Sequence, residues 1–192
     1  MPSDSVQIIR APVAYVDQLA QRTISDIDLL VVHCTELPDL ATARQYAERV
    51  LYESGTGNCG HFYIDRDGAC WEYVPIERVA HHARGFNPRT IGVELVNLGR
   101  FPDWLHSEHQ GPTEAYPATQ ISALSGFLEY LSARIPSLRW IAGHEDLDSE
   151  WVTASDDHTV PVKRKLDPGP LFPWNQLLRR TQLKPYSARM AG

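Results

Sequence analysis

Two histidines and one aspartate in this chain have the types and the placement expected of metal ligands. His33 ends a long apolar run, and His144 ends a short one. Asp167 lies in a stiff segment that contains two prolines and a glycine. Two imidazoles and one carboxylate suit a divalent ion, zinc best of all. Three protein ligands leave a fourth position for water, as in a catalytic zinc site.

The elements expected to position the two histidines are strands that end close to them. Residues 27–35 are mostly aliphatic and β-branched, which predicts a strand buried on both faces of a sheet. Residues 91–98 and 137–143 predict two further strands. Ligand sites in open α/β sheets usually lie at strand ends. The sequence therefore predicts that the imidazoles meet at one end of a sheet.

Helices, a hairpin and loops account for the rest of the chain. An Asp-Gly pair between the aromatic-rich runs 61–65 and 69–74 predicts a β-hairpin. Apolar residues at helical spacing predict helices over 40–51, 121–131 and from 173 onward. Residues 99–117 and 145–164 are expected to be loops.

The mixed order of strands and helices favours the α/β class, with one central mixed β-sheet flanked by helices and a zinc cleft at the sheet end. We expect a single functional domain over residues 27–183. It follows an irregular N-terminal arm, residues 1–26, and precedes a C-terminal tail, residues 184–192.

Composition narrows the possible functions. The chain has 192 residues, which is enough for one domain with a full hydrophobic core. Its formal net charge of -6 is unlike that of a nucleic-acid-binding protein. No run approaches the length of a transmembrane helix, and no signal peptide is visible. The odd number of cysteines, Cys34, Cys59 and Cys70, predicts buried free thiols and a reducing compartment. We therefore expect a cytoplasmic protein, with export by phage lysis or a secretion system as the alternative.

Each candidate ligand also has an ordinary structural interpretation. A histidine at the end of an apolar strand is more often a hydrogen-bonded core residue, and an aspartate before proline is commonly a turn residue. The shared placement of all three, each just past the end of an element, favours the metal site.

Five short motifs, in order along the chain, resemble those of the type 2 N-acetylmuramoyl-L-alanine amidases. That family includes AmpD-like wall-recycling enzymes and phage lysozyme-type amidases, and it shares its fold with peptidoglycan recognition proteins. The resemblance covers residues 27 to about 180. The motifs are Val-His-Cys-Thr at 32–35, Gly-His-Phe-Tyr-Ile at 60–64, Ile-Gly-Val-Glu-Leu at 91–95, Ala-Gly-His at 142–144 and Lys-Leu-Asp-Pro-Gly-Pro at 165–170.

The resemblance implies a role for each matching residue. His33, His144 and Asp167 correspond to the zinc ligands of the family. Glu94 corresponds to the base that activates the attacking water, and Lys165 to the lysine that steadies the developing oxyanion. A positioned carboxylate and a nearby cation are chemically suited to these tasks. His82 corresponds to the histidine of the family's substrate-facing loop.

Several residues keep a second interpretation. Glu94 could instead be the buried partner of an arginine, although a charge in an apolar strand favours a function. Lys165 could belong to a solvated basic turn. His61 could be a ligand, but strand alternation places it in the hairpin, where it packs or lines the cleft next to substrate. Either His81 or His82 could face the site.

The two long loops match the family least and are expected to shape substrate choice. Their histidines and aspartates could bind a second metal, but a solvated surface is the better interpretation (His106, His109, His158, Asp156 and Asp157). Their aromatic residues, Trp104, Tyr116 and Trp151, could stack on sugar rings.

The predicted function is hydrolysis of the amide between the lactyl group of N-acetylmuramic acid and L-alanine of the stem peptide. Zn²⁺ is the expected cofactor, and peptidoglycan or a muropeptide is the expected partner. Two alternatives stay open: a peptidoglycan-binding module without catalysis, and a zinc peptidase that cuts within the stem peptide. The sequence does not distinguish soluble anhydro-muropeptides from polymeric wall as substrate, and it does not predict the oligomeric state.

Overall fold

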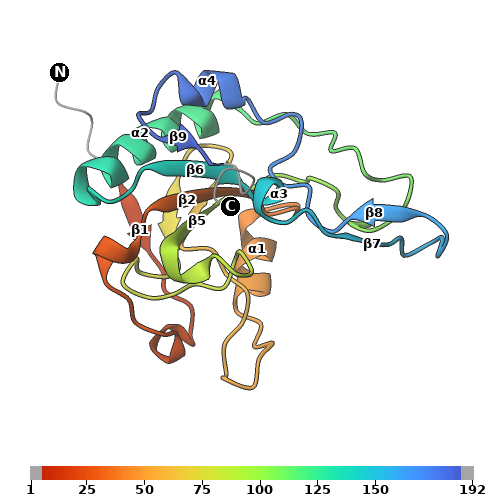
Figure 1. The fold of residues 1–192 in the computed structure, drawn as a ribbon, viewed down its shortest axis with the longest axis horizontal. Coiled ribbons are helices and arrows are strands. Elements are labelled where there is room, and N and C mark those ends of the chain that lie inside the picture. Colours follow the sequence, from red (N-terminus) through yellow and green to blue (C-terminus); the bar gives the residue numbers. More distant parts are fainter. Residues whose placement is uncertain (1–5, 187–192) are drawn as a thin grey trace.

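The computed structural model describes residues 6–186, and a seven-stranded mixed sheet forms its centre (Figure 1). The strand order is β1-β4-β3-β5-β2-β6-β9. The strands are β1 Ile8–Arg10, β2 Leu29–Cys34, β3 Phe62–Ile64, β4 Cys70–Glu72, β5 Thr90–Leu95, β6 Trp140–Gly143 and β9 Lys184–Pro185. The predicted α/β fold with a central mixed sheet is confirmed.

Parallel pairing brings the chemically interesting strand ends together. β2 pairs in parallel with β5 on one side and with β6 on the other. β3 and β4 form the predicted antiparallel hairpin, and β3 also pairs in parallel with β5. Because the carboxyl ends of the parallel strands β2, β5 and β6 lie at the same end of the sheet, residues from distant parts of the sequence meet there.

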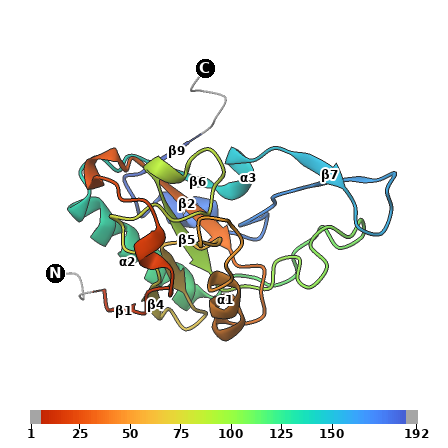
Figure 2. The ribbon, with the colours of Figure 1, turned by 90° about the horizontal axis from the view of Figure 1, so that it is seen from below.

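The helices cover both faces of the sheet (Figures 1 and 2). The helices are α1 Leu40–Ala47, α2 Ala118–Arg134, α3 His144–Leu147 and α4 Trp174–Leu178, with short 3-10 turns at Val16–Gln18, Ile24–Asp26 and Asn87–Arg89. α2 and α4 lie over one face and α1 lies over the other. No helix within residues 6–186 is both long and apolar enough to cross a membrane.

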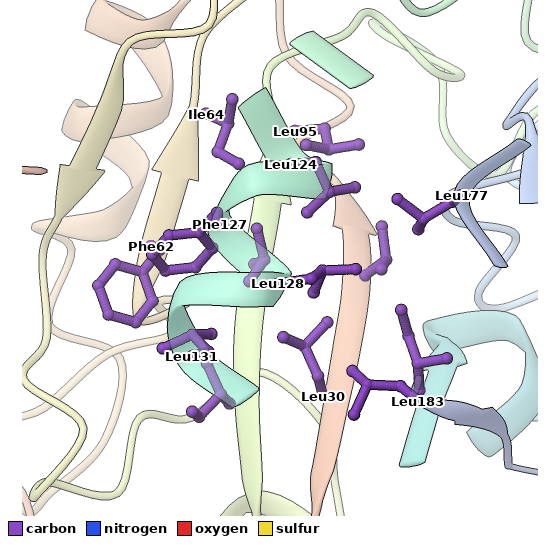
Figure 3. Close-up of a cluster of buried hydrophobic side chains, with 14 of the residues drawn as sticks. Leu30, Phe62, Ile64, Leu95, Leu124, Phe127, Leu128, Leu131, Leu177 and Leu183 are labelled. Atoms are coloured by element: carbon purple, nitrogen blue, oxygen red, sulfur yellow. The ribbon is translucent and has the colours of Figure 1, made fainter. Parts of the chain in front are cut away.

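The main core lies between the sheet and α2 (Figure 3). Alternate residues of β5 point toward α2, and Phe127 of the helix packs edge-on against Phe62 of β3 with ring centroids 4.6 Å apart. Gln120, fully buried near the start of α2, donates hydrogen bonds to the carbonyl oxygens of Ile64 and Val96. These contacts fix the helix against the ends of β3 and β5.

Three segments contain regular structure that the sequence did not predict. The N-terminal arm was expected to be irregular, but Ile8–Arg10 forms an edge strand along β4. The loop expected at 145–164 contains α3 and a two-stranded hairpin, β7 Trp151–Thr153 and β8 Pro161–Lys163. Of the predicted tail, Lys184–Pro185 pairs with β6, and residues 187–192 lie outside the described part.

The hairpin β7–β8 and the loop 99–117 extend together beyond the same end of the sheet (Figures 1 and 2). The backbone of Ser155 donates to the carbonyl oxygen of Leu105, and Ser107 donates twice to the carboxylate of Asp156. The three cysteines are free and buried, as predicted.

Candidate metal centre and active-site cleft

Three side chains converge at the carboxyl ends of β2 and β6. His33 lies near the end of β2, and His144 is the first residue of α3, directly after β6. Asp167 comes from the loop that follows β8. Its Oδ2 lies 2.9 Å from Nδ1 of His33 and 3.2 Å from Nδ1 of His144. All three side chains are at least 95 % buried.

The donor set and its environment fit a divalent metal ion. One nitrogen from each histidine and one carboxylate oxygen lie within 4.8 Å of one another, the spacing of ligands around a single ion. The second carboxylate oxygen of Asp167 is buried and has no hydrogen-bond partner within the described residues. Burial lowers the pKa of His33 to about 4, which keeps the imidazole in the neutral form that binds metals.

A chain of hydrogen bonds fixes the orientation of His33. The hydroxyl of Thr90 donates to the carbonyl oxygen of Phe86, so it accepts from Nε2 of His82 at 3.1 Å. Nδ1 of His82 then accepts from Nε2 of His33 at 2.9 Å. His33 therefore presents the unprotonated Nδ1 to Asp167, an arrangement that a shared cation would stabilise.

His82 lines the cleft as well as contacting His33. Burial holds its pKa well below the usual value. A Cβ on Gly92 of β5 would lie 2.6 Å from the His82 ring, so the glycine leaves room for the imidazole. His81 also lines the cleft, where its Nδ1 lies 3.5 Å from the hydroxyl of Thr56.

His61 lies behind His82 rather than in the cleft. It is fully buried, and its ring packs edge-on against His82 with centroids 5.4 Å apart. The backbone N–H of Gly92 donates to Nδ1, and Nε2 lies 3.1 Å from the carbonyl oxygen of Arg78. His61 therefore has no exposed surface with which to make the predicted direct contact with a substrate. Its surroundings are those of a buried residue that packs against His82.

Glu94 lies beside His33 on the same face of the sheet. The two residues are register partners across β5 and β2, and Tyr63 of β3 continues the row. Burial, followed by the charge of Asp167, raises the pKa of Glu94 to about 8, and the charge of Lys165 opposes the rise. Within residues 6–186, no arginine is among the charged groups that shift this pKa, which leaves the alternative interpretation of Glu94, as the buried partner of an arginine, without support.

Lys165 lines the cleft two residues before Asp167. Glu94 and Asp167 line the same cleft, and the positive charge of Lys165 acts to lower the pKa values of both carboxyl groups. The neighbouring Arg164 points elsewhere, into ion pairs with Asp148 and Glu150. The position of Lys165 in the cleft therefore does not favour the alternative interpretation, in which this residue belongs to a solvated basic turn.

The cleft has a volume of about 820 Å³, and its lining includes both motif residues and residues of loops that the motifs do not cover. Trp104 lines it, whereas Tyr116 donates its hydroxyl to the carbonyl oxygen of Pro168 and Trp151 is exposed on β7. His106 and His109 stack on each other in the outer loop. Within residues 6–186 no second group of metal-ligand type is present.

The family model described as N-acetylmuramoyl-L-alanine amidase matches residues 23–170. The chain belongs to this family. The matched segment contains all three converging side chains together with Glu94 and Lys165, and it ends at the last residue of the Asp167 motif.

Individual members of the family share both sequence and fold with the chain. It is 34% identical over 118 residues to N-acetylmuramoyl-L-alanine amidase AmiD of Escherichia coli, a match that covers 57% of the chain and 37% of AmiD. A structure of Escherichia coli AmiD with the substrate anhydro-N-acetylmuramic acid-L-Ala-D-gamma-Glu-L-Lys has a TM-score of 0.61 at 23% identity, covering 84% of this chain and 60% of that one. The endolysin amidase LysCS from Clostridium intestinale has a TM-score of 0.60 at 19% identity, over 95% and 99% of the two chains. The chain thus spans little more than a third of the length of the curated relative.

Proposed function

We propose that the protein is a zinc-dependent amidase that hydrolyses the bond between the lactyl group of N-acetylmuramic acid and L-alanine of the stem peptide. The observation that carries this proposal is the convergence of His33, His144 and Asp167 beside Glu94 and Lys165, within the family-matched region. The structure of AmiD in complex with an anhydro-muramoyl peptide supports the substrate class.

The metal would be held by His33, His144 and Asp167. A zinc ion bound there supplies a Lewis acid that polarises the scissile carbonyl and lowers the pKa of a bound water to about 7. The contact from His82 to His33 keeps the first imidazole in the required tautomer and orientation.

Glu94 moves the proton. Its carboxylate projects from β5 next to His33, on the cleft side of the sheet. From there it takes a proton from the attacking water and delivers it to the departing amine of L-alanine. A cation at Asp167 opposes the rise in the Glu94 pKa and favours the ionised carboxylate that a base requires.

Lys165 stabilises the charge that develops on the carbonyl oxygen. It lines the same cleft as Glu94 and Asp167, and its positive charge acts on both carboxylates. A fixed positive charge at this position interacts more strongly with the tetrahedral oxyanion than with the neutral amide, so it accelerates the chemical step.

Digestion of purified sacculi and of a soluble anhydro-muropeptide, each with and without a chelator, tests the proposal. Mass spectrometry should detect intact stem peptides with N-terminal L-alanine, and the chelator should abolish their release. Cleavage inside the peptide would instead indicate a peptidase. Binding of sacculi without any cleavage would indicate a non-catalytic module. The preferred substrate would distinguish soluble muropeptides from polymeric wall.

Replacement of a ligand provides the matched test of the metal assignment. The Asp167→Ala variant should fold but lose both bound zinc and activity, because two neutral imidazoles alone hold zinc weakly. Zinc content measured by elemental mass spectrometry checks this outcome. Full zinc occupancy in the variant would refute the assignment of Asp167 as a ligand.

A further inference from the structure

Arg100 is a buried arginine that the catalytic proposal does not use. It follows β5 in the loop 99–117 and is only 3% exposed. Its Nε and Nη2 donate to the two carboxylate oxygens of Glu36 at 2.7 and 3.1 Å, and its backbone N–H donates to the same carboxylate. This is a two-pronged ion pair of the kind that fixes orientation as well as charge.

The outer edge of the same guanidinium reaches the segment that carries Lys165. Nη1 donates to the carbonyl oxygen of Lys163 at 3.0 Å and to the side chain of Gln110 at 3.1 Å. Nη2 lies 3.4 Å from the carbonyl oxygen of Arg164. Arg100 therefore joins the residues just after β2 to the two peptide groups that immediately precede Lys165.

The backbone around Glu36 is shaped to make this connection. Glu36 has a φ of +51°, in the left-handed region that residues with a Cβ rarely adopt. A Cβ on Gly99 would lie 2.6 Å from Cγ of Glu36, so the glycine leaves space for the acidic side chain. Trp104 donates its indole N–H to the carbonyl oxygen of Glu36 at 3.0 Å. An uncommon backbone conformation at this position persists because several contacts hold it.

We propose that Arg100 is a positioning residue for Lys165. Paired with Glu36, it holds the Lys163–Arg164 backbone against the end of β2, and this fixes the direction in which Lys165 enters the cleft. The guanidinium is satisfied by Glu36, Gln110 and the two carbonyl groups, so it acts through Lys165 rather than on the substrate. The inference rests on the proposed amidase function, in which Lys165 stabilises the oxyanion.

The Arg100→Lys variant tests this role because it keeps the charge opposite Glu36 but loses the fork that reaches the carbonyl groups. We expect kcat for a soluble anhydro-muropeptide to fall about 10- to 100-fold, because small displacements of a transition-state group cost rate. KM should stay unchanged, because Lys165 acts on charge that exists only in the transition state. Hydrogen exchange at the amides of residues 163–167 should become faster.

Arg66→Lys is the matched control. Arg66 also forms a two-pronged ion pair, with Glu114 of the same loop, at 2.6 and 2.9 Å, but it does not reach residues 163–164. This control should leave kcat and the exchange of residues 163–167 at their wild-type values. Equal loss of kcat in both variants would assign the effect to general loosening of the loop and would overturn the proposal.

A second variant guards against a failure to fold. Replacing both partners, Glu36→Met with Arg100→Met, removes the ion pair without leaving a buried charge, an exchange that proteins often tolerate. A folded double variant should show the same loss of kcat and the same faster exchange. Wild-type kcat and wild-type exchange in either folded variant would overturn the proposal, as would a failure of both variants to fold, since the pair would then be purely structural.

The exchange measurement separates this inference from the proposed function, because it needs no substrate. If the wild-type protein cleaves no muropeptide but residues 163–167 lose protection in Arg100→Lys, the amidase proposal fails while the positioning contact stands.

Discussion

At the scale of single residues, the centre depends on which atom each side chain presents. His33 faces Asp167 through Nδ1 because its Nε2 is engaged by His82, which is engaged in turn by Thr90. Glu94 is brought beside His33 by strand register and not by a hydrogen bond. In the proposed mechanism, metal binding and proton transfer therefore depend on different contacts, so we expect mutations to separate them.

Glu94→Gln should separate the two functions in one direction. The amide keeps the size of the side chain and cannot accept a proton from water, so turnover should fall about 10²- to 10⁴-fold while zinc stays bound. Steady-state kinetics and zinc content, measured on the same preparation, check this prediction. Near-normal turnover would remove Glu94 from the mechanism.

His82→Ala should weaken metal binding while leaving the proposed base, Glu94, in place. Without its partner, Nε2 of His33 loses the contact that fixes its tautomer, and zinc affinity should fall about 10- to 100-fold. Competition with a chelator of known affinity measures this change. His81→Ala is the control, because His81 lines the same cleft without touching His33, and its zinc affinity should match that of the wild type.

The sequence predicts the residues of the centre better than their connections. The ligands and Glu94 were recognisable because each lies in a short motif. The pairing of Glu36 with Arg100 was not, because the partners are 64 residues apart and each alone is an ordinary charged residue. The sequence also could not predict which of His81 and His82 contacts His33. The side chains of adjacent loop residues, unlike those of a strand, do not alternate in a fixed pattern.

At the scale of elements, β5 serves the core and the cleft at once. Ile91, Val93 and Leu95 pack into the main core, while Thr90, Gly92 and Glu94 face the histidines. A shift of one residue in register would exchange the two sets. α2 holds the strand in register through its apolar face, so the helix secures the geometry of a site that it does not touch.

Phe127→Ala in α2 should therefore be strongly destabilising. The ring is fully buried against Phe62, and its loss should lower the free energy of unfolding by about 3–5 kcal/mol. Urea denaturation measures the difference. Glu129→Ala, on the exposed side of the same helix, should change stability by no more than about 0.5 kcal/mol. Similar values for the two variants would contradict this account of the core.

The elements that the sequence predicted well are the ones with a strong apolar pattern. β2 is buried at every position and α2 has a continuous apolar face. The strands that it missed, β1, β7, β8 and β9, are two or three residues long and largely exposed. Their pairing is decided by neighbouring chain segments, and a local pattern carries little information about such contacts.

At the scale of the whole molecule, buried histidines should make stability sensitive to acid. Burial, followed by the charge of Arg22, holds the pKa of His61 well below 6.5. The unfolded chain takes up a proton at this residue near pH 6.5, whereas the folded protein does not. The unfolded state therefore binds more protons below that pH, and stability must fall as the pH drops.

His61→Gln should reduce this acid sensitivity. Between pH 6.5 and 4.5 the slope of unfolding free energy against pH should decrease by up to about 1.4 kcal/mol per pH unit. Urea unfolding of both chelator-treated proteins across this range measures the slopes, and the other titrating groups are common to both. Identical slopes would show that His61 is protonated in the folded protein.

The distance along the chain between the first and the last proposed ligand determines when the centre can be completed during synthesis of the protein. His33 and Asp167 are 134 residues apart, and β2, β5 and β6 are all complete before Asp167 is made. Because chains emerge from the ribosome N-terminus first, the sheet can begin to form while the centre still lacks its carboxylate. Under the proposed function, metal capture would be a late event, and a nascent chain that stalls before residue 167 would lack one of its three proposed ligands.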